Sequence, residues 1–215
     1  MMDAEHFFSA AEKERIAATI KAVEGETAGE IAVMVVDASD TYPEGIVLGG
    51  VILGGLAALA VTDYFLNASL WLYVPCAVTG ALLTALALKF LPAVHRLFVP
   101  ASQLEHRVRV RAEQAFFAQG LHHTRDHSGV LFFLSLFERR VWVLADQGIY
   151  QKIGQDELQT YATQVTTGLK SGRKSEALCA EITRFGKLLA QHFPIKPDDS
   201  NELANEVIAE GRRKP

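Results

Sequence analysis

The 215-residue chain has little of what marks secreted scaffolds and nucleic-acid-binding proteins. Its two cysteines, Cys76 and Cys179, are too few for a disulfide framework and lack metal-ligand spacing, which is typical of a reducing compartment. The net charge is -4, so the chain lacks the surplus of basic residues that is typical of nucleic-acid-binding proteins. Residues 1–25 are charged and have no continuous apolar region, so we expect no cleaved signal peptide.

Motifs of the common enzyme classes are also missing from the sequence. It contains no nucleophile elbow, Cys–His pair or dinucleotide fingerprint. The stretch GLKSGRKS, Gly168–Ser175, has the residue types of a phosphate loop but not the G-x4-G-K-S spacing. It also lies between two expected helices, whereas a phosphate loop follows a strand. We interpret it as an inter-helix loop.

Two long uncharged runs stand in the middle of the chain, Gly45–Thr62 and Leu70–Leu88. At ~1.5 Å per residue each run reaches about 27–29 Å as a helix, close to a hydrocarbon core of ~30 Å. Only Asp63–Ser69 separates them, and aromatic residues cluster at that turn, as is common at a membrane interface. The pattern predicts two antiparallel transmembrane helices with the lipid bilayer as partner.

Glycine is frequent in the first run, where Gly50 and Gly54 form a G-x-x-x-G step. Small residues allow helix backbones to approach closely in lipid, and Gly80 and Ala81 of the second run are candidates to face this step. The alternative is that glycine is simply common in membrane helices. Neither run has an ionisable residue in its middle, which disfavours a transporter subunit.

Lysine and arginine predict the orientation of the hairpin. None occurs in Glu30–Glu44 or in the Asp63–Ser69 turn. Five follow the second span: Lys89, Arg96, Arg107, Arg109 and Arg111. The positive-inside rule places that side in the cytoplasm, and two spans return the chain to its starting side. We therefore expect both termini to be cytoplasmic. The arginines are alternatively contacts for anionic lipid head groups.

The residues flanking the hairpin have the pattern of a small α/β domain. Ser9–Glu24 is expected to be a helix that begins with a capping box between Ser9 and Glu12. Ile31–Val36 is a continuous apolar run, typical of a strand covered on both faces. Gly129–Leu136 and Arg140–Leu144 predict a β-hairpin. The other expected helices are Gln103–Gln119 and two more, lined by Leu158, Tyr161, Val165 and Leu169 and by Leu178, Ile182, Phe185 and Leu189.

A buried strand cannot stand alone, because its backbone and both faces need partners. We expect Ile31–Val36 to pair with Val130–Leu136, which requires both flanks to lie on one side of the membrane. The expected organisation is then a first part of the domain in 1–44, a hairpin in 45–91, the remainder of the domain in 101–193 and a polar tail in 194–215. Within that tail only NELANEVI has the pattern of an ordered segment.

Three stretches give the chain a family resemblance: GEIAVMVVDAS, TRDHSGVLFFLSLFERRVWVLADQGI and HFPIKPDDSNELANEV. With the helices between them, they resemble the bacterial membrane-protein branch of the TPM domain family. The resemblance implies an α/β/α sandwich with a small mixed sheet, here interrupted after the first strand by a two-helix transmembrane hairpin, and a location in the bacterial inner membrane. Ala145-Asp146-Gln147-Gly148 replaces a glycine-rich turn common in soluble members.

The resemblance also implies candidate activities. Some TPM domains are thought to bind Ca²⁺ or Mg²⁺ through acidic residues at one edge of the sheet. A phosphatase activity has been suggested for some members, and roles in the repair or assembly of membrane complexes for others. Because this chain replaces the glycine-rich turn, the resemblance gives less support to a cation site with the geometry of the family's site.

Three aspartates, Asp37, Asp126 and Asp146, flank the expected strands. If the first two strands are parallel, Asp37 and Asp126 lie at opposite ends of the sheet. Asp126 and Asp146 then lie at the same end, because the β-hairpin returns the third strand beside the start of the second. Hard cations prefer converging carboxylate oxygens, so Asp126 and Asp146 are the candidate Ca²⁺ or Mg²⁺ ligands. The alternative is routine capping of loops and turns by aspartate.

The loop before the second strand carries His122, His123 and His127. On a helix, His123 and His127 would share a face, as in many zinc sites. The following Ser-Gly and apolar run instead favour a solvated loop that leads into a strand, and the remaining alternative gives Thr124, Arg125 or Asp126 a role in holding this loop or an anion. At the hairpin turn, Glu138 and Arg139 are expected to be solvated, with a partner-binding tip as the alternative.

The function predicted from these patterns is a membrane-anchored, non-enzymatic interaction or assembly module, with a divalent cation as a candidate ligand. Its expected partner is a membrane or cytoplasmic protein, and nucleic acid is not expected. The alternative is a divalent-cation-dependent phosphatase, in which Asp126 and Asp146 would hold the metal.

Overall fold

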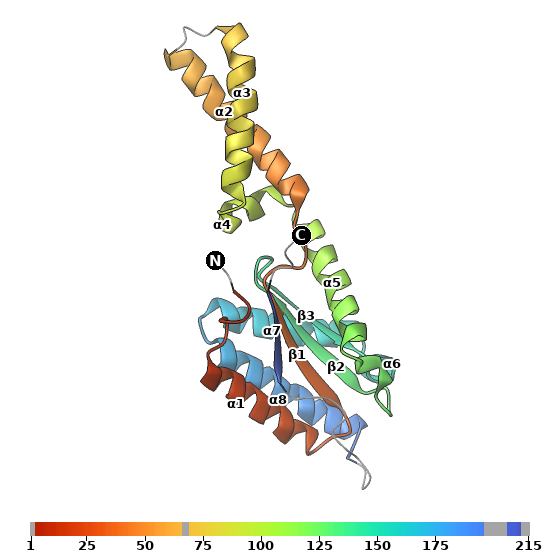
Figure 1. Cartoon of the computed structure of the whole chain (residues 1–215). Helices are drawn as coiled ribbons and strands as arrows, with labels where there is room; N and C mark the ends of the chain where they lie inside the picture. Colours follow the sequence, from red (N-terminus) through yellow and green to blue (C-terminus); the bar gives the residue numbers. More distant parts are fainter. Residues whose placement is uncertain (1–2, 66–68, 196–205, 212–215) are drawn as a thin grey trace. The chain divides into compact units, whose positions relative to one another are not determined.

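The computed structural model describes residues 3–65, 69–195 and 206–211 (Figure 1). Their Cα positions group into two compact units. One consists of residues 40–105, which we call the hairpin unit, and the other of the described residues within 2–39 and 106–215, which we call the α/β unit. The α/β unit is therefore built from both flanks of the hairpin.

A mixed sheet forms the centre of the α/β unit, and its described strands lie in the order β3-β2-β1-β4. The strands are β1 (Glu30–Val36), β2 (Gly129–Ser135), β3 (Arg140–Ala145) and β4 (Val207–Glu210). β1 is parallel to β2, with Ile31 opposite Val130, and also parallel to β4. β2 and β3 are antiparallel. The predicted pairing of the first strand with the strand beyond the hairpin is confirmed.

Helices cover the sheet on both faces, which makes an α/β/α sandwich (Figure 1). Ile31, Val33 and Val35 of β1 face one core, and Ala32, Met34 and Val36 face the other. The first core is closed by α1 (Ala10–Glu24), α6 (Gln147–Ile153), α7 (Gln155–Lys170) and α8 (Lys174–His192), the second by α5 (Ala101–Ala118). Every residue of β1 is buried, as the continuous apolar run predicts.

The capping box predicted at the start of α1 is present. The Ser9 hydroxyl oxygen accepts from the main-chain N–H of Glu12 at 3.3 Å, and the Glu12 carboxylate accepts from the main-chain N–H of Ser9 at 2.9 Å. That second hydrogen bond is the main reason why the pKa of Glu12 is lowered. Ile16, Ile20 and Val23 face the core from this helix, so its apolar spacing also matches the prediction.

Three described elements of the α/β unit were not predicted, and the first is the 3-10 helix η2 (Leu121–His123), in a stretch expected to be a loop. α6 is a short helix between β3 and α7, capped by Asp146. β4 comes from the segment predicted to be a polar tail, and it extends the sheet beside β1. Of the stretch NELANEVI, only Glu206–Ile208 lies within the described residues, and Val207 and Ile208 belong to β4.

The hairpin unit contains α2 (Pro43–Phe65), α3 (Leu70–Leu88), α4 (Pro92–His95) and the 3-10 helix η1 (Arg96–Phe98). α2 and α3 pack through the glycine step. A Cβ atom on Gly54 would lie 2.3 Å from the main-chain nitrogen of Ala81, so only glycine permits this approach. The Thr84 hydroxyl donates to the carbonyl of Gly50 at 2.9 Å. Gly50 and Gly54 are thus a packing motif, as the first of the two interpretations predicted.

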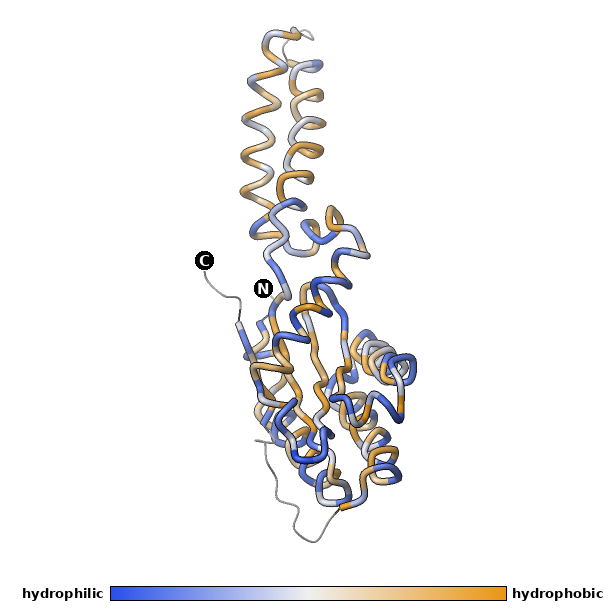
Figure 2. The backbone as a smooth tube through the Cα atoms, turned by 90° about the vertical axis from the view of Figure 1, so that its right-hand side faces the viewer, coloured by the Kyte–Doolittle hydropathy of each residue, from blue (hydrophilic) through white to orange (hydrophobic). Residues whose placement is uncertain are grey.

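The outer faces of α2 and α3 are apolar and exposed. Figure 2 shows hydrophobic residues along both helices, and these helices are long and apolar enough to span a membrane by length and composition. Leu56 is 59% exposed and Leu82 is 67% exposed, while the glycine face is buried. The hairpin unit therefore uses its small residues for its own packing and presents its large ones outward.

Candidate functional site

The loop of Asp126 and the start of α6 lie together at one end of the sheet. The main-chain N–H of Asp146 donates to the carbonyl of Gly129 at 2.9 Å. A Cβ atom on Gly148 would lie 2.9 Å from the carbonyl oxygen of Asp126. Because β1 and β2 are parallel, Asp37 follows β1 at the opposite end. This is the arrangement of the three aspartates that parallel pairing predicts.

The carboxylate of Asp146 has two partners at this end. One oxygen accepts from the main-chain N–H of Gln147 at 2.7 Å, which caps α6, and the other lies 3.1 Å from Nδ1 of His127. Asp146 therefore caps a helix and orients a histidine. Metal binding by Asp126 and Asp146 remains a prediction, and a cation here would have to share Asp146 with His127.

The three histidines of the loop do not converge on one point. The His122 ring packs edge-on against the Phe117 ring, with 5.0 Å between their centroids. The centroid of the His123 ring lies 3.8 Å from that of His122. His127 turns toward Asp146. Thr124 holds the loop, because its hydroxyl accepts from the main-chain N–H of Ser128 at 3.0 Å. This contact agrees with the alternative in which Thr124 holds the loop. Thr124 and Ser128 are buried, so the loop is only partly solvated.

The opposite end of the sheet holds a buried polar cluster that the sequence did not reveal. Glu138 is 0% exposed, so the prediction of a solvated turn at this residue is wrong. One carboxylate oxygen accepts from the main-chain N–H of Ser39 at 2.8 Å, and the other accepts from the hydroxyl of Ser135. The Ser39 hydroxyl donates to that of Ser135 at 2.9 Å. Arg139 beside it is exposed, as predicted.

Glu138 is buried because the chain that leaves β1 passes over the turn between β2 and β3. The main-chain N–H groups of Leu136 and Phe137 donate to the carbonyls of Val36 and Asp37 at 3.0 and 2.9 Å. Burial of a carboxyl group costs free energy unless hydrogen bonds compensate, and Ser39 and Ser135 supply them. The cluster fastens the residue that precedes the hairpin unit to the rest of the sheet.

Asp37 and Glu210 belong to the same end. The Asp37 carboxylate accepts from the main-chain N–H of Ala4 at 2.6 Å, and its main-chain N–H donates to the carbonyl of Glu210 at 3.3 Å. The Glu210 carboxylate forms an ion pair with Arg111 of α5. Asp37 thus links the N-terminal segment, β1 and β4, and Arg111 attaches β4 to the second helical layer.

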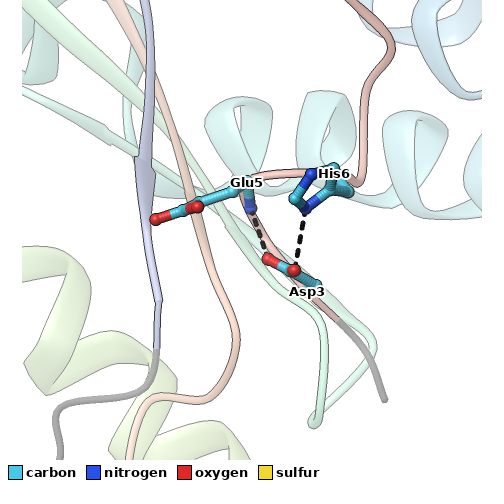
Figure 3. A group of neighbouring side chains, drawn as sticks. All are labelled: Asp3, Glu5 and His6. Carbon is cyan, nitrogen blue, oxygen red and sulfur yellow. Dashed lines mark hydrogen bonds and ion pairs between the residues drawn. The ribbon is translucent and has the colours of Figure 1, made fainter.

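A group of exposed acidic and imidazole side chains lies on the N-terminal segment (Figure 3). The candidate ligand atoms of Asp3, Glu5 and His6 lie within 4.8 Å of one another. His6 Nδ1 is 2.8 Å from an oxygen of Asp3, and this hydrogen bond is the main reason why the pKa of Asp3 is lowered. Cations such as Ca²⁺ need six to eight oxygens at about 2.3–2.6 Å, which this exposed group does not supply by itself.

Among the solved structures, the chain is similar to the NMR structure of the BA42 protein from the psychrophilic bacterium Bizionia argentinensis. The TM-score is 0.60 at 20% sequence identity, over 95% of this chain and 96% of that chain. No family model matches the chain, and no curated protein matches it. At this identity the similarity shows the fold alone. BA42 is a TPM-like domain protein, so the fold agrees with the one that the sequence resemblance implies.

The α/β unit also has a shallow groove of about 430 Å³ between α1 and α8, which lie side by side in Figure 1. Its floor is the contact of Val23 with Gly186, where a Cβ atom on the glycine would lie 2.2 Å from Val23. The groove is lined by Arg15, Ala18, Thr19, Ala22, Val23, Glu26, Thr183, Gly186 and Lys187. These residues provide no nucleophile with an adjacent base, so the groove does not suggest catalysis.

Proposed function

We propose that this chain is a membrane-anchored α/β protein that serves as a non-enzymatic interaction or assembly module. The observation that carries the proposal is the division of the hairpin unit into two kinds of surface. Its glycine face is buried in the contact between α2 and α3. Its outer faces expose large apolar side chains such as Leu56 and Trp71, of which Trp71 is 91% exposed. Apolar surface of this extent is stabilised by lipid, not by water.

The proposed orientation places both flanks of the hairpin in the cytoplasm, with the chain in the inner membrane of a bacterium. Lysine and arginine are absent from the Asp63–Ser69 turn and recur after α3, which supports a cytoplasmic location of the flanks. The pairing of β1 with β2 supports a common side for the residues before and after the hairpin, because one sheet cannot form across a bilayer.

Cysteine labelling tests this topology. In a chain with Cys76→Ala and Cys179→Ala, single cysteines are introduced by Tyr64→Cys near the turn, Glu14→Cys in α1 and Arg139→Cys at the β2–β3 turn, all exposed positions. We expect a membrane-impermeant maleimide to label the first in spheroplasts and the other two only after lysis. Labelling of Glu14→Cys and Arg139→Cys from different sides would refute the proposal.

The α/β unit is proposed to dock a membrane or cytoplasmic protein. This part of the proposal is supported by the fold. At one end of the sheet the Ser135 hydroxyl does donate to the Glu138 carboxylate, but both side chains are buried, so a substrate could not reach this pair without a rearrangement. Chemical cross-linking in native membranes tests this docking. We expect the same cross-linked partner in repeated preparations, lost on competition with unlabelled chain, and recovery of the chain without a reproducible partner would refute the docking role.

A further inference from the structure

After α3 ends at Leu88, the chain forms a short segment that we call the collar, Lys89–Phe98, which contains α4 and η1. The main-chain N–H of Leu91 donates to the carbonyl of Leu88 at 3.2 Å, so the chain turns directly out of α3. Pro92 stands in the first turn of α4, where its missing N–H costs nothing. The collar thus follows the second apolar helix without any intervening polar loop.

The inner side of the collar packs on the first turns of α2. His95 is 3% exposed, and its Nε2 lies 3.0 Å from the carbonyl oxygen of Tyr42. A Cβ atom on Gly45 would lie 3.1 Å from Nε2 of His95, and one on Gly49 would lie 2.7 Å from Phe98. The collar therefore has a defined place within the hairpin unit, beside the residues where α2 begins.

The outer side of the collar carries large apolar side chains that the described chain leaves exposed. Phe90 is 78% exposed, Leu91 is 52% exposed and Leu97 is 81% exposed. Lys89, next to Phe90, is exposed as well. A short segment with one side packed and the other lined by leucine, phenylalanine and lysine has the composition of chain that lies in a membrane interface, about 5–10 Å into the boundary of head groups and acyl chains.

We propose that the collar is an interfacial anchor, with Phe90, Leu91 and Leu97 inserted among the acyl chains just below the head groups. The inference rests on the proposed membrane anchoring. It adds that the bilayer surface lies at the level of the collar, at the end of the hairpin that connects to the α/β unit. Lys89 extends its ammonium group into the head-group layer, as lysine does beside buried apolar surface.

Continuity of the apolar surface favours lipid over a protein as the occupant. Leu86, in the last turn of α3, is 54% exposed, and Val47 and Leu48, in the first turns of α2 against which the collar packs, are 63% and 49% exposed. Along the chain, exposed apolar side chains therefore continue from the last turn of α3 into the collar, with Lys89 as the one charged residue between Leu86 and Leu91. Lipid can cover the exposed apolar side chains of the helices and of the collar together. A protein docked on the collar would instead have to end where the lipid-covered helices begin.

Depth-dependent fluorescence quenching tests the inference on the full chain in phosphatidylcholine–phosphatidylglycerol vesicles. With Trp71→Phe and Trp142→Phe as background, single tryptophans are introduced by Leu97→Trp in the collar, Leu56→Trp in the middle of α2 and Tyr150→Trp in the α/β unit. We expect a nitroxide near the head group to quench the tryptophan of Leu97→Trp about twofold more than one near the chain end. The opposite order is expected for Leu56→Trp, and quenching by aqueous acrylamide for Tyr150→Trp.

The outcomes separate this inference from the proposed anchoring. If Leu56→Trp is quenched by the deep nitroxide but Leu97→Trp only by acrylamide, the anchoring stands and the interfacial collar is refuted. Shielding of Leu97→Trp from lipid and acrylamide alike would mean that a protein or a second copy covers the collar, which also refutes it. If Leu56→Trp is quenched by neither nitroxide, the anchoring itself fails, and the collar proposal fails with it.

Discussion

A carboxylate oxygen of Glu138 accepts a hydrogen bond from the main-chain N–H of Ser39 at 2.8 Å, although the two residues are 99 positions apart in sequence. Ser39 is the last residue of the α/β unit before the hairpin unit, and Glu138 lies in the turn between β2 and β3. This hydrogen bond therefore closes the α/β unit across the inserted hairpin, at the position where the chain leaves the sheet.

Substitution of Glu138 is expected to destabilise the α/β unit. Glu138→Ala leaves the N–H of Ser39 and the hydroxyl of Ser135 without their acceptor in a buried place, which costs about 1–3 kcal/mol in the free energy of unfolding. Thermal unfolding in detergent, followed by the fluorescence of Trp142 in a Trp71→Phe chain, measures the loss. Glu14→Ala, an exposed glutamate of α1, is the control. A Glu138→Ala midpoint equal to that of the control would contradict the assignment.

The packing of α2 on α3 predicts that alanine substitution destabilises the helix pair at Gly54 but not at the adjacent Gly55. In Gly54→Ala the new methyl group meets the main chain of Ala81, so the helices must separate, at a cost of about 1–3 kcal/mol. In Gly55→Ala the nearest atom is the Tyr73 hydroxyl at 3.9 Å, which is ordinary contact. Labelling of Cys76 by a thiol-reactive dye during heating, with Cys179→Ala as background, should show a lower midpoint for Gly54→Ala alone. Equal midpoints would exclude this interface.

Tyr161 predicts a loss of stability at alkaline pH. Burial raises its pKa above that of free tyrosine, and the opposing effect of Arg184, whose guanidinium lies 5.0 Å from the ring centroid, is smaller. Because the folded-state pKa is the higher one, the contribution is complete below the unfolded-state pKa and is lost as pH rises through the folded-state pKa.

Spectroscopic titration of tyrosinate absorbance measures this pKa directly. We expect the wild-type chain to show a late-ionising tyrosine that Tyr161→Phe lacks. Denaturation with urea at several alkaline pH values should show a weaker pH dependence for Tyr161→Phe. If the late-ionising group persists in Tyr161→Phe, another residue is responsible.

The proposed cation site predicts a selective effect of Asp146. Asn caps helices about as well as Asp, so Asp146→Asn should preserve α6 while it removes a charged ligand. Calorimetric titration of the full chain with Ca²⁺ and with Mg²⁺ should give binding heat that Asp146→Asn reduces at least about tenfold in affinity and that Asp3→Asn leaves unchanged. Absence of binding heat in the wild-type chain, or its loss in Asp3→Asn only, would rule out Asp126 and Asp146 as ligands.

The main elements of the fold follow from local patterns in the sequence. The apolar run of β1 is buried on both faces because parallel strands with helices on each side have no solvated face. The capping box of Ser9 and Glu12 sets the start of α1 because both partners lie within one helical turn. α6 and β4 were missed because each is short, and the four residues of β4 are only partly buried, so their pattern is weak.

The candidate sites were predicted less completely than the fold, because part of their geometry depends on residues far apart in the sequence. Asp126 and Asp146 were expected at one end of the sheet because strand direction alone places them there. Glu138 was assigned to a solvated turn because a Glu-Arg pair between two strands is typical of one. Its burial depends on Ser39, which arrives from the other side of the hairpin, and no spacing in the sequence relates the two residues.

The sequence by itself determined the long helices and the strands β1, β2 and β3, the length and apolarity of α2 and α3, and the need for the two flanks to share one sheet. These properties depend on periodicity and composition within a few turns of chain. Only the tertiary structure decided which carboxylates are buried, which strand occupies the free edge of β1 and which apolar side chains of the collar stay exposed. Those outcomes depend on contacts between residues far apart in the chain, where burial and hydrogen bonding are set by packing and not by local pattern.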